Sequence, residues 1–450
     1  MPPYLGTSLS AASPWWRTSL GDRLIIRGPR RLVGKYPISG AKNAALPLMV
    51  ASLLTPHLVT LRNVPANLDV AVLSNLLQRL GVSLSWSSGP EGLSLTLCAD
   101  HVYAALIDRD LVARMRASIL LLGALLARRG EACLPMPGGD AIGMRGIDFH
   151  IAGLRAMGAD IEVGGGVVYA RARHGLRGAA IALSQPSVGA TENLMLAAVL
   201  ASGRSVIENA AREPEVADLA KCLGAMGARI KGVNSDVLTI EGGAPLIGAV
   251  HKVMPDRIEV GTIACATAMT NGEMFLEHAR ADLLGAAEPV FAEAGVTLQQ
   301  VEGGLIARRA ASGITGIDLQ TRPYPGFATD LQAPAMAMLT TAQGASAITE
   351  TIFEQRFRHV DELRKMGANI TVRGRTAWVR GVKRLTGARV VGTDVRAAAA
   401  LVSAGLTAQG ETILDGLEHL DRGYDNMMEK LVACGADMSR SGNKAEDITE

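Results

Sequence analysis

The hydrophobic and polar positions of the chain repeat one pattern six times. In each repeat an amphipathic, helix-like stretch ends at a glycine, and a strand-like alternation of apolar and polar residues follows. A glycine in this place suits the left-handed backbone that ends a helix. The six glycines are Gly81, Gly158, Gly227, Gly295, Gly367 and Gly435, at intervals of 77, 69, 68, 72 and 68 residues. This regular spacing indicates an internal repeat.

Each repeat predicts the same order of elements. A helix that is apolar nearly all round comes first, and such a helix is expected to be buried. A polar turn, a strand, a charged loop, an amphipathic helix and the glycine–strand segment then follow. The apolar helices are predicted over 44–54, 117–127, 192–201, 262–269, 331–339 and 397–406. Because six such modules would overfill one core, we predict an α/β fold of two domains with three modules each.

The modules also predict where the domains begin and end. We expect the first domain to cover residues 42–254, and the second to combine 21–41 with 255–450. The chain would then cross between the domains near Lys42 and near Met254. Residues 1–20 have neither a basic start nor a continuous apolar run, so we expect a disordered tail rather than a secretory signal.

Composition narrows the class of protein. The chain has 450 residues, of which 48% are hydrophobic and 20% charged, as in an ordinary globular protein. A net charge of +2 gives no reason to expect nucleic acid or a membrane surface as a partner. The five cysteines are scattered, with no CxxC pair and no histidine at metal-ligand spacing. We therefore expect a cytoplasmic protein without a bound metal.

Charged and polar residues gather in two places of the module. One is the start of the buried helix, where free N–H groups favour phosphate, and the other is the loop after the central strand. The first place holds Lys42, Asn43, Arg116, Ser187, Gly189, Asp256, Asp330, Asp394 and Arg396, and the second holds Asp140, Arg145, Arg212, Glu213, Glu354, Arg356 and Arg422. Any one of them has an ordinary explanation as a helix cap or a solvated ion pair. Their recurrence predicts that they converge between the domains, around a ligand with several negative charges.

The turn over residues 134–150 holds the closest grouping of glycine and charged residues in the sequence. A glycine pair, Gly138 and Gly139, precedes Asp140, and Arg145 and Asp148 follow. Adjacent glycines permit unusual backbone angles and let a ligand approach the main chain closely. A Pro-Gly-Gly-Asp sequence is also typical of a surface turn, so the tetrapeptide alone does not decide between the two interpretations.

Ten motifs in order give the chain a family resemblance. They are SGAKNAALP, MRAS, PGGxAIGxR, PSVGATEN, AAREPE, PDRIEVGT, TDLQ, FExRFxHV, TDxRA and HxDRGY, and they extend from about Leu24 to about Arg440. Together they resemble the UDP-N-acetylglucosamine enolpyruvyl transferase family. The resemblance implies an inside-out α/β barrel of two domains. It also implies transfer of the enolpyruvyl group of phosphoenolpyruvate to the 3′-hydroxyl of the sugar nucleotide, with release of phosphate and no cofactor, as the first committed step of peptidoglycan synthesis.

The resemblance assigns the basic residues to phosphoenolpyruvate. Lys42, Arg145 and Arg422 would contact its phosphate and carboxylate, and Arg356 and Arg396 would complete the cationic wall. These residues therefore form the expected site of the anionic substrate.

The resemblance places other residues at the sugar nucleotide. Asn43 and Asp330 would lie at the sugar, with Asp330 as the base for the attacking hydroxyl. Ser187 and Gly189 would contact the diphosphate, with Arg116 supporting them.

Three positions depart from the family pattern: Asp140, Gly146 and Ala328, which precedes Thr329 where the family usually has proline. Asp140 stands where most members carry the cysteine that helps to protonate the methylene carbon of the substrate and that reacts with fosfomycin. The resemblance therefore implies an enzyme that is insensitive to fosfomycin. In the uracil-binding stretch 145–150, which includes Asp148, Gly146 replaces a proline.

These departures leave alternatives open. A paralogue could enolpyruvylate another nucleotide, such as UMP, in specialised metabolism. A non-catalytic binder of nucleotide sugars is a second alternative, although the retained Lys42, Asp330, Arg396 and Arg422 argue against it. The shikimate-pathway enolpyruvyl transferase shares the fold implied here but lacks the PGGxAIG and AAREPE motifs.

Overall fold

The computed structural model describes residues 22–103 and 107–441. The tail predicted over residues 1–20 lies outside these ranges. In the described residues the six apolar helices form and are almost wholly buried, as predicted. They are α1 (Lys42–Ala51), α4 (Leu120–Arg129), α6 (Val188–Ala198), α8 (Arg257–Met269), α10 (Gln332–Leu339) and α12 (Val395–Thr407). Short 3-10 turns extend three of them: η2 (Ser52–Leu54) follows α1, η3 (Arg116–Ile119) precedes α4 and η5 (Thr329–Leu331) precedes α10.

An amphipathic helix precedes each of the six repeated glycines. These helices are α2 (Leu68–Arg79), α5 (Asp148–Ala156), α7 (Pro214–Ala225), α9 (Ala287–Glu293), α11 (His359–Lys365) and α14 (Met427–Ala433). The six glycines have φ angles between 87° and 101°, in the left-handed region that glycine adopts without strain. The predicted helix ends are therefore confirmed. The remaining short helices are α3 (Arg109–Ala113), η4 (Ala281–Leu283) and α13 (Leu417–Gly423).

The strands of the first three modules form three separate sheets. In spatial order these are β13 (Ala249–Lys252), β3 (Val59–Arg62), β5 (Gly92–Cys98) and β4 (Ser83–Gly89); β6 (Glu131–Pro135), β8 (Val167–Arg171) and β7 (Asp160–Gly164); and β11 (Arg229–Lys231), β12 (Val237–Glu241), β10 (Arg204–Glu208) and β9 (Ala180–Ala182). In the third sheet the short β9 lies parallel to β10, and β12 lies antiparallel to it. The first sheet has the same arrangement, but its parallel strand β13 comes from the far end of the third module.

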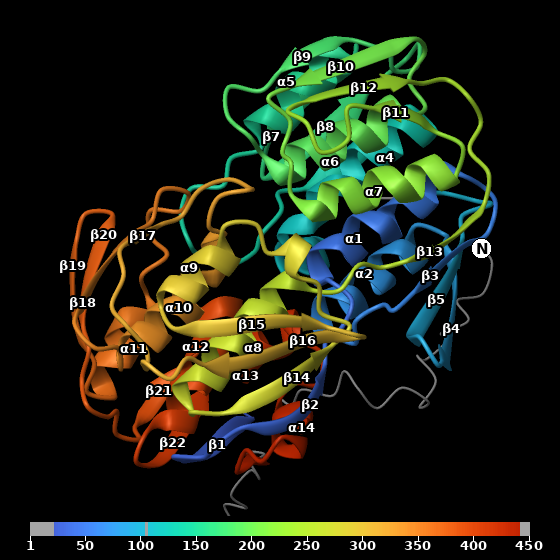
Figure 1. The fold of residues 1–450 in the computed structure, drawn as a ribbon. Coiled ribbons are helices and arrows are strands. Elements are labelled where there is room, and N and C mark those ends of the chain that lie inside the picture. Colours follow the sequence, from blue (N-terminus) through green and yellow to red (C-terminus); the bar gives the residue numbers. More distant parts are fainter. Residues whose placement is uncertain (1–21, 104–106, 442–450) are drawn as a thin grey trace, which may run out of the picture.

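The last three modules form the other three sheets. They are β15 (Val296–Val301), β16 (Gly304–Arg309), β14 (Glu273–Glu277) and β2 (Val33–Pro37); β17 (Leu319–Gln320), β18 (Ala345–Thr349), β20 (Thr376–Arg380) and β19 (Asn369–Arg373); and β21 (Arg389–Val391), β22 (Gly410–Asp415), β1 (Arg23–Gly28) and β23 (Met438–Ser441). The strands β1 and β2 thus pair with elements from the last three modules, and Figure 1 shows these blue strands beside the red β22 and α14.

Buried apolar side chains form two clusters in the described residues. The first extends from Ala41 to Met254 and includes α1, α4 and α6. The second combines Leu24 to Ile38 with Ile258 to Met438 and includes α8, α10 and α12, which pack against one another. Elements of the first cluster lie in the upper and right-hand part of Figure 1 and those of the second in the lower and left-hand part. Helices fill the centre of each cluster, and many strands keep alternate residues exposed on the outer face.

Two further properties of the described residues concern membrane-spanning helices and metal sites. Their helices are all too short or too polar to cross a lipid bilayer. The same residues contain no set of three or more histidine, cysteine or acidic side chains placed to hold a metal ion.

Candidate active site

Three of the polar residues at the starts of buried helices are helix caps. The Asp256 carboxylate accepts hydrogen bonds from two backbone N–H groups at the start of α8, at 2.8 and 3.0 Å. Asp394 accepts two in the same way at the start of α12, at 2.9 and 3.0 Å. The Ser187 hydroxyl accepts one at the start of α6. The ordinary explanation of these residues as caps therefore holds, and their contacts with a ligand stay predictions.

The first charged group of the site is centred on Asp330. One carboxylate oxygen lies 2.7 Å from Nη2 of Arg356, and the other lies 3.0 Å from Nη2 of Arg396. Asn43, which lies in helix α1 of the first cluster, donates a long hydrogen bond of 3.5 Å to the same carboxylate. Both arginine side chains are buried, with 5% and 3% of their surface exposed. Residues predicted from three different modules therefore meet at one carboxylate.

The second charged group is centred on Asp69 in the first turn of α2. Its carboxylate lies 3.1 Å from Nζ of Lys42 and 2.9 Å from Nε of Arg422. The guanidinium of Arg422 also lies 2.6 Å, through Nη1, from a carboxylate oxygen of Asp140. His419 approaches the same oxygen to 3.6 Å. Arg422 and His419 both lie in α13, which belongs to the second cluster, so this group joins the two halves of the molecule.

The loop that carries Asp140 is held in place on both sides. A side chain at Gly138 would collide with the backbone carbonyl of Ala113. Glycine is therefore needed here because the protein's own backbone lies so close. Gly139 has a φ of 114°, which other residues avoid. Farther along, the backbone N–H of Met144 donates to the Glu354 carboxylate at 2.8 Å. The loop from the first cluster is therefore anchored to the loop after β18 in the second.

The cations around Asp140 and Asp330 determine the protonation of both groups. Burial alone would raise the pKa of Asp140, but nearby His419 and the charges of Arg422 and Lys42 hold it well below its usual range. Burial would likewise raise the pKa of Asp330, but its arginine partners outweigh burial and lower the pKa strongly. Both carboxyl groups are therefore ionised at neutral pH in this arrangement.

Arg145 and Arg116 lie near these groups and close enough to each other for their positive charges to interact. The guanidinium carbon of Arg145 lies 5.5 Å from the ring centroid of Phe353, a cation–π contact. Burial lowers the pKa of Arg145, and the negative charges of Asp330 and Asp140 offset part of this lowering. Burial and the charge of Arg145 lower the pKa of Arg116 to about 10. Arg116 donates a hydrogen bond to the carbonyl of Gly146, and this contact holds the loop at the position where the family pattern has proline.

The stretches predicted to bind the nucleotide come together beside α6. His150 is hydrogen-bonded through Nδ1 to the side-chain amide of Asn193 at 2.9 Å. Burial and the charge of Arg116 lower the pKa of His150 to about 3, so its ring is neutral at neutral pH. Gly189 faces this ring, because a side chain there would begin 3.5 Å from it. Asp148 lies in the first turn of α5, on the same segment as His150.

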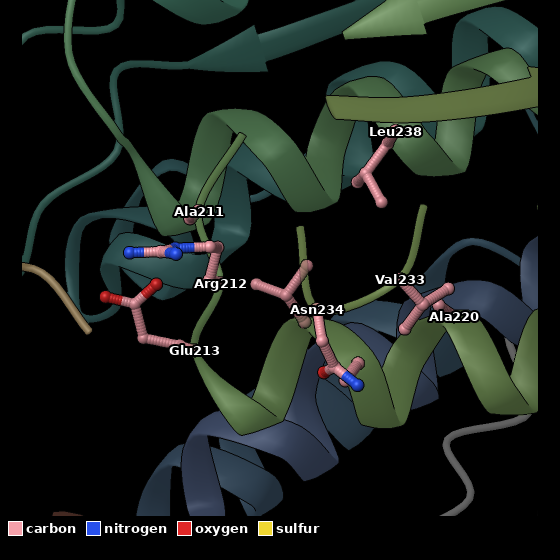
Figure 2. A pocket seen from close by; sticks show the side chains of 9 residues that line it. Ala211, Arg212, Glu213, Ala220, Val233, Asn234 and Leu238 are labelled. Carbon is pink, nitrogen blue, oxygen red and sulfur yellow. The ribbon is translucent and has the colours of Figure 1, made fainter. Parts of the chain in front are cut away.

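Arg212 and Glu213 are separate from the two charged groups. They line a narrow pocket with Val233, Asn234 and Leu238, and Figure 2 shows their side chains extending together at the start of α7, away from Leu238. One oxygen of Glu213 accepts a hydrogen bond from the backbone N–H of Tyr324 at 3.3 Å. This contact again crosses between the clusters, but it adds no cation to the site.

Sequence reasoning did not single out two residues of the site, Asp69 and His419. Asp69 follows the first module's strand β3 and lies in the first turn of α2. Asp140 and Arg422 also follow the strands of their modules, so the repeat could have pointed to Asp69. His419 lies three residues before Arg422 in the HxDRGY motif. Both contact residues that were predicted.

Comparison with known proteins places the chain in a family. Residues 26–431 match the family model described as EPSP synthase (3-phosphoshikimate 1-carboxyvinyltransferase). The chain belongs to this family. Within it, the chain is 53% identical over 426 residues to the UDP-N-acetylglucosamine 1-carboxyvinyltransferase of Rhodospirillum centenum, covering 93% of this chain and 99% of that protein. It is 52% identical over 419 residues to the protein of the same name from Gluconobacter oxydans, with the same coverage.

Two solved structures share the fold of this chain. The enolpyruvyl transferase NikO from Streptomyces tendae superposes with a TM-score of 0.83 at 24% identity, over 94% of this chain and 99% of its own. The EPSP synthase of Acinetobacter baumannii superposes with a TM-score of 0.69 at 18% identity, over 94% and 100%. The prediction of a two-domain α/β enolpyruvyl transferase fold is confirmed. In this chain the six sheets of the described residues remain separate open sheets.

Proposed function

We propose that the chain transfers the enolpyruvyl group of phosphoenolpyruvate to the 3′-hydroxyl of UDP-N-acetylglucosamine and releases phosphate. The product would enter peptidoglycan synthesis in the cytoplasm. Support comes from relatives of that name at more than 50% identity over nearly the whole chain. The observation that carries the proposal is the pair of carboxylates at the junction of the two clusters: Asp330 is held by two buried arginines and Asp140 by the half-buried Arg422.

The reaction needs anion binding, a base and an acid at one place. We assign Lys42, Arg145 and Arg422 to the phosphate and carboxylate of phosphoenolpyruvate, with Arg356 and Arg396 beside them. Arginine suits these groups because its planar fork makes paired, charge-assisted hydrogen bonds to carboxylate and phosphate. All five cations already contact or face an aspartate of the site.

In the proposed reaction the two aspartates have opposite roles. Asp330 accepts the proton of the 3′-hydroxyl while the 3′-oxygen of the sugar forms a bond to C2 of phosphoenolpyruvate. Asp140 delivers a proton to the methylene carbon C3. Phosphate then leaves C2 and takes up the proton that Asp330 accepted, while C3 returns a proton to Asp140, which restores the vinyl group on the sugar. The protons balance, because both aspartates end in the protonation states in which they began.

The binding of an anion would prepare both aspartates for these roles. Without ligand, arginine charges hold both pKa values low, so Asp330 is a weak base and Asp140 lacks a proton to give. The phosphate and carboxylate of the substrate would compete for the same cations. As each cation turns to the ligand, the pKa of the aspartate that it leaves rises. The substrate itself would thus activate the acid and the base.

The nucleotide would bind on the side of the site formed by the first cluster. We assign the diphosphate to the start of α6 at Ser187 and Gly189, where free N–H groups and the helix dipole favour an anion, with Arg116 nearby. The stretch 145–150, including Asp148, would receive the uracil. Neutral His150 adds no charge to this end of the site.

A comparison of acceptors tests the proposal. Phosphate release from phosphoenolpyruvate is measured with UDP-N-acetylglucosamine, with UMP and with shikimate 3-phosphate, each at equal concentration. We expect release that depends on UDP-N-acetylglucosamine. Preferred turnover of UMP would instead support the alternative paralogue, and tight binding of the sugar nucleotide without phosphate release would support the non-catalytic binder.

A further inference from the structure

Glu350 is a buried carboxylate that lies next to the site without contacting its reactive groups. It follows β18 directly, and none of its surface is exposed. One oxygen accepts three hydrogen bonds, from the Thr321 hydroxyl at 2.8 Å and from two backbone N–H groups of the following loop at 2.8 and 3.1 Å. The other oxygen accepts one, from the Thr329 hydroxyl at 2.8 Å. Glu350 therefore ties together three segments that surround Asp330.

The contact with Glu350 sets the direction of the Thr329 hydroxyl. Thr329 is the donor in this hydrogen bond, so its single hydroxyl proton points to Glu350. The lone pairs of that hydroxyl are then free for another donor. Nη1 of Arg356 donates to them at 2.9 Å. Glu350 thus makes Thr329 an acceptor for an arginine.

Thr329 and its neighbour Asp330 both contact the guanidinium of Arg356. Nη1 of Arg356 donates to Thr329, and Nη2 lies 2.7 Å from the Asp330 carboxylate. The main chain of Arg356 is fixed as well, because Gln332 donates a hydrogen bond of 3.2 Å to its carbonyl. Two neighbouring acceptors fix the plane of the guanidinium, whereas one would leave it free to turn about a single contact.

We propose that Glu350 and Thr329 are positioning residues, which orient the Arg356 guanidinium so that it faces both Asp330 and the incoming phosphoenolpyruvate. This inference rests on the proposed function and adds to it a relay from Glu350 through Thr329 to Arg356. Neither residue is assigned a contact with reacting atoms. A small error in the position of a charged group is enough to reduce turnover strongly.

Thr329→Val tests the relay, because valine has the shape of threonine but neither donates nor accepts. We expect turnover to fall about 10- to 100-fold. Thr329→Ser restores the hydroxyl and should recover most of the activity. Thr340→Val is the matched control: Thr340 is also buried, but its hydroxyl donates only to the carbonyl of Ala337 at the end of α10.

The pH profile separates positioning from loss of stability. When Arg356 turns away, the pKa of Asp330 rises, so the acid limb of kcat/KM should move to higher pH in Thr329→Val. The limb should stay in place in Thr340→Val, even if both variants melt at a lower temperature. A destabilised protein with an intact site would show no such movement.

A double-variant cycle tests whether Glu350 acts through Thr329. In Glu350→Gln the amide oxygen must stay at the three donors, so the NH₂ group faces Thr329 and its hydroxyl proton loses its acceptor. We expect a smaller loss than in Thr329→Val and no additional loss in the double variant. Three outcomes would each overturn the relay. Thr329→Val and Thr340→Val could have equal turnover, or Thr329→Val and Thr329→Ser could lose equal activity. The third is that the losses in the cycle are additive. A parent protein that releases no phosphate with any of the acceptors would overturn the proposed function, and the relay with it.

Discussion

Replacement of Asp140 by cysteine should change both the pH profile and the response to fosfomycin. The position carries the proposed proton donor, and the structure places it 2.6 Å from Arg422. A carboxylic acid can donate only while protonated, so activity should fall as pH rises through the pKa of Asp140 in the substrate complex. A thiol, with a reference pKa of about 8.5, keeps its proton to higher pH.

The size of the effect follows from the charges around Asp140. An ordinary aspartate with a pKa of about 3.9 is protonated in roughly one molecule in a thousand near neutral pH, and Asp140 lies below that range without ligand. Half-protonation at neutral pH needs a rise of at least about 3 units, or about 4 kcal/mol. One unit charge at about 4 Å contributes about 4 kcal/mol near a protein surface. Neutralisation of Arg422 by the substrate phosphate therefore supplies about the minimum rise, and neutralisation of Lys42, whose charge also lowers the pKa of Asp140, would add to it.

The assay is turnover against pH for the parent and for Asp140→Cys, with intact mass after incubation with fosfomycin. We expect the parent to lose activity toward alkaline pH earlier than the variant. The parent should remain unlabelled, and the variant should gain a covalent adduct and lose activity, since a thiolate opens an epoxide far better than a carboxylate does. Identical pH profiles would refute the reasoning. Labelling of a natural cysteine of the parent with loss of activity would refute it as well.

Further predictions concern the other charged residues. Arg422→Ala should weaken phosphoenolpyruvate binding by about 1.5–3 kcal/mol, whereas Asp330→Ala should chiefly lower turnover, by a factor on the order of 100 or more; steady-state kinetics separates the two, and near-normal turnover would remove Asp330 from the mechanism. Asp69→Asn leaves the half-buried Lys42 and Arg422 without their shared carboxylate, a loss of up to about 3–5 kcal/mol. Calorimetry should show a lower melting temperature that inorganic phosphate partly restores, and equal melting temperatures for parent and variant would contradict this.

Much of the fold could be predicted because its signals are local. The left-handed glycines, such as Gly227 and Gly367, end helices whose apolar pattern is visible in the sequence, and the buried helices follow from their composition. The partners of β1 and β2 could not be predicted from local pattern. Leu24 pairs with Leu414, and this choice depends on how the modules assemble, which no short stretch records. The short parallel strands, such as β17 with two residues, carry too few residues for an alternating pattern.

The same distinction applies to the site. The repeat predicted that charges converge, and Lys42, Asp140, Asp330 and Arg422 lie in the two ion-pair groups of the site. It did not predict which charges pair. The place of Asp69 between two cations depends on the relative position of the two clusters, and sequence spacing within one module holds no information about that position.

The most direct test of the central claim is the structure of the sugar product. Purified protein is incubated with phosphoenolpyruvate and UDP-N-acetylglucosamine, and the product is examined by NMR and mass spectrometry, with a 3′-deoxy sugar nucleotide as control. We expect vinyl protons on a group attached to the 3′-oxygen, one phosphate released for each product molecule, and no product from the 3′-deoxy compound. Recovery of both substrates unchanged, or a product modified at another position, would contradict the proposed function.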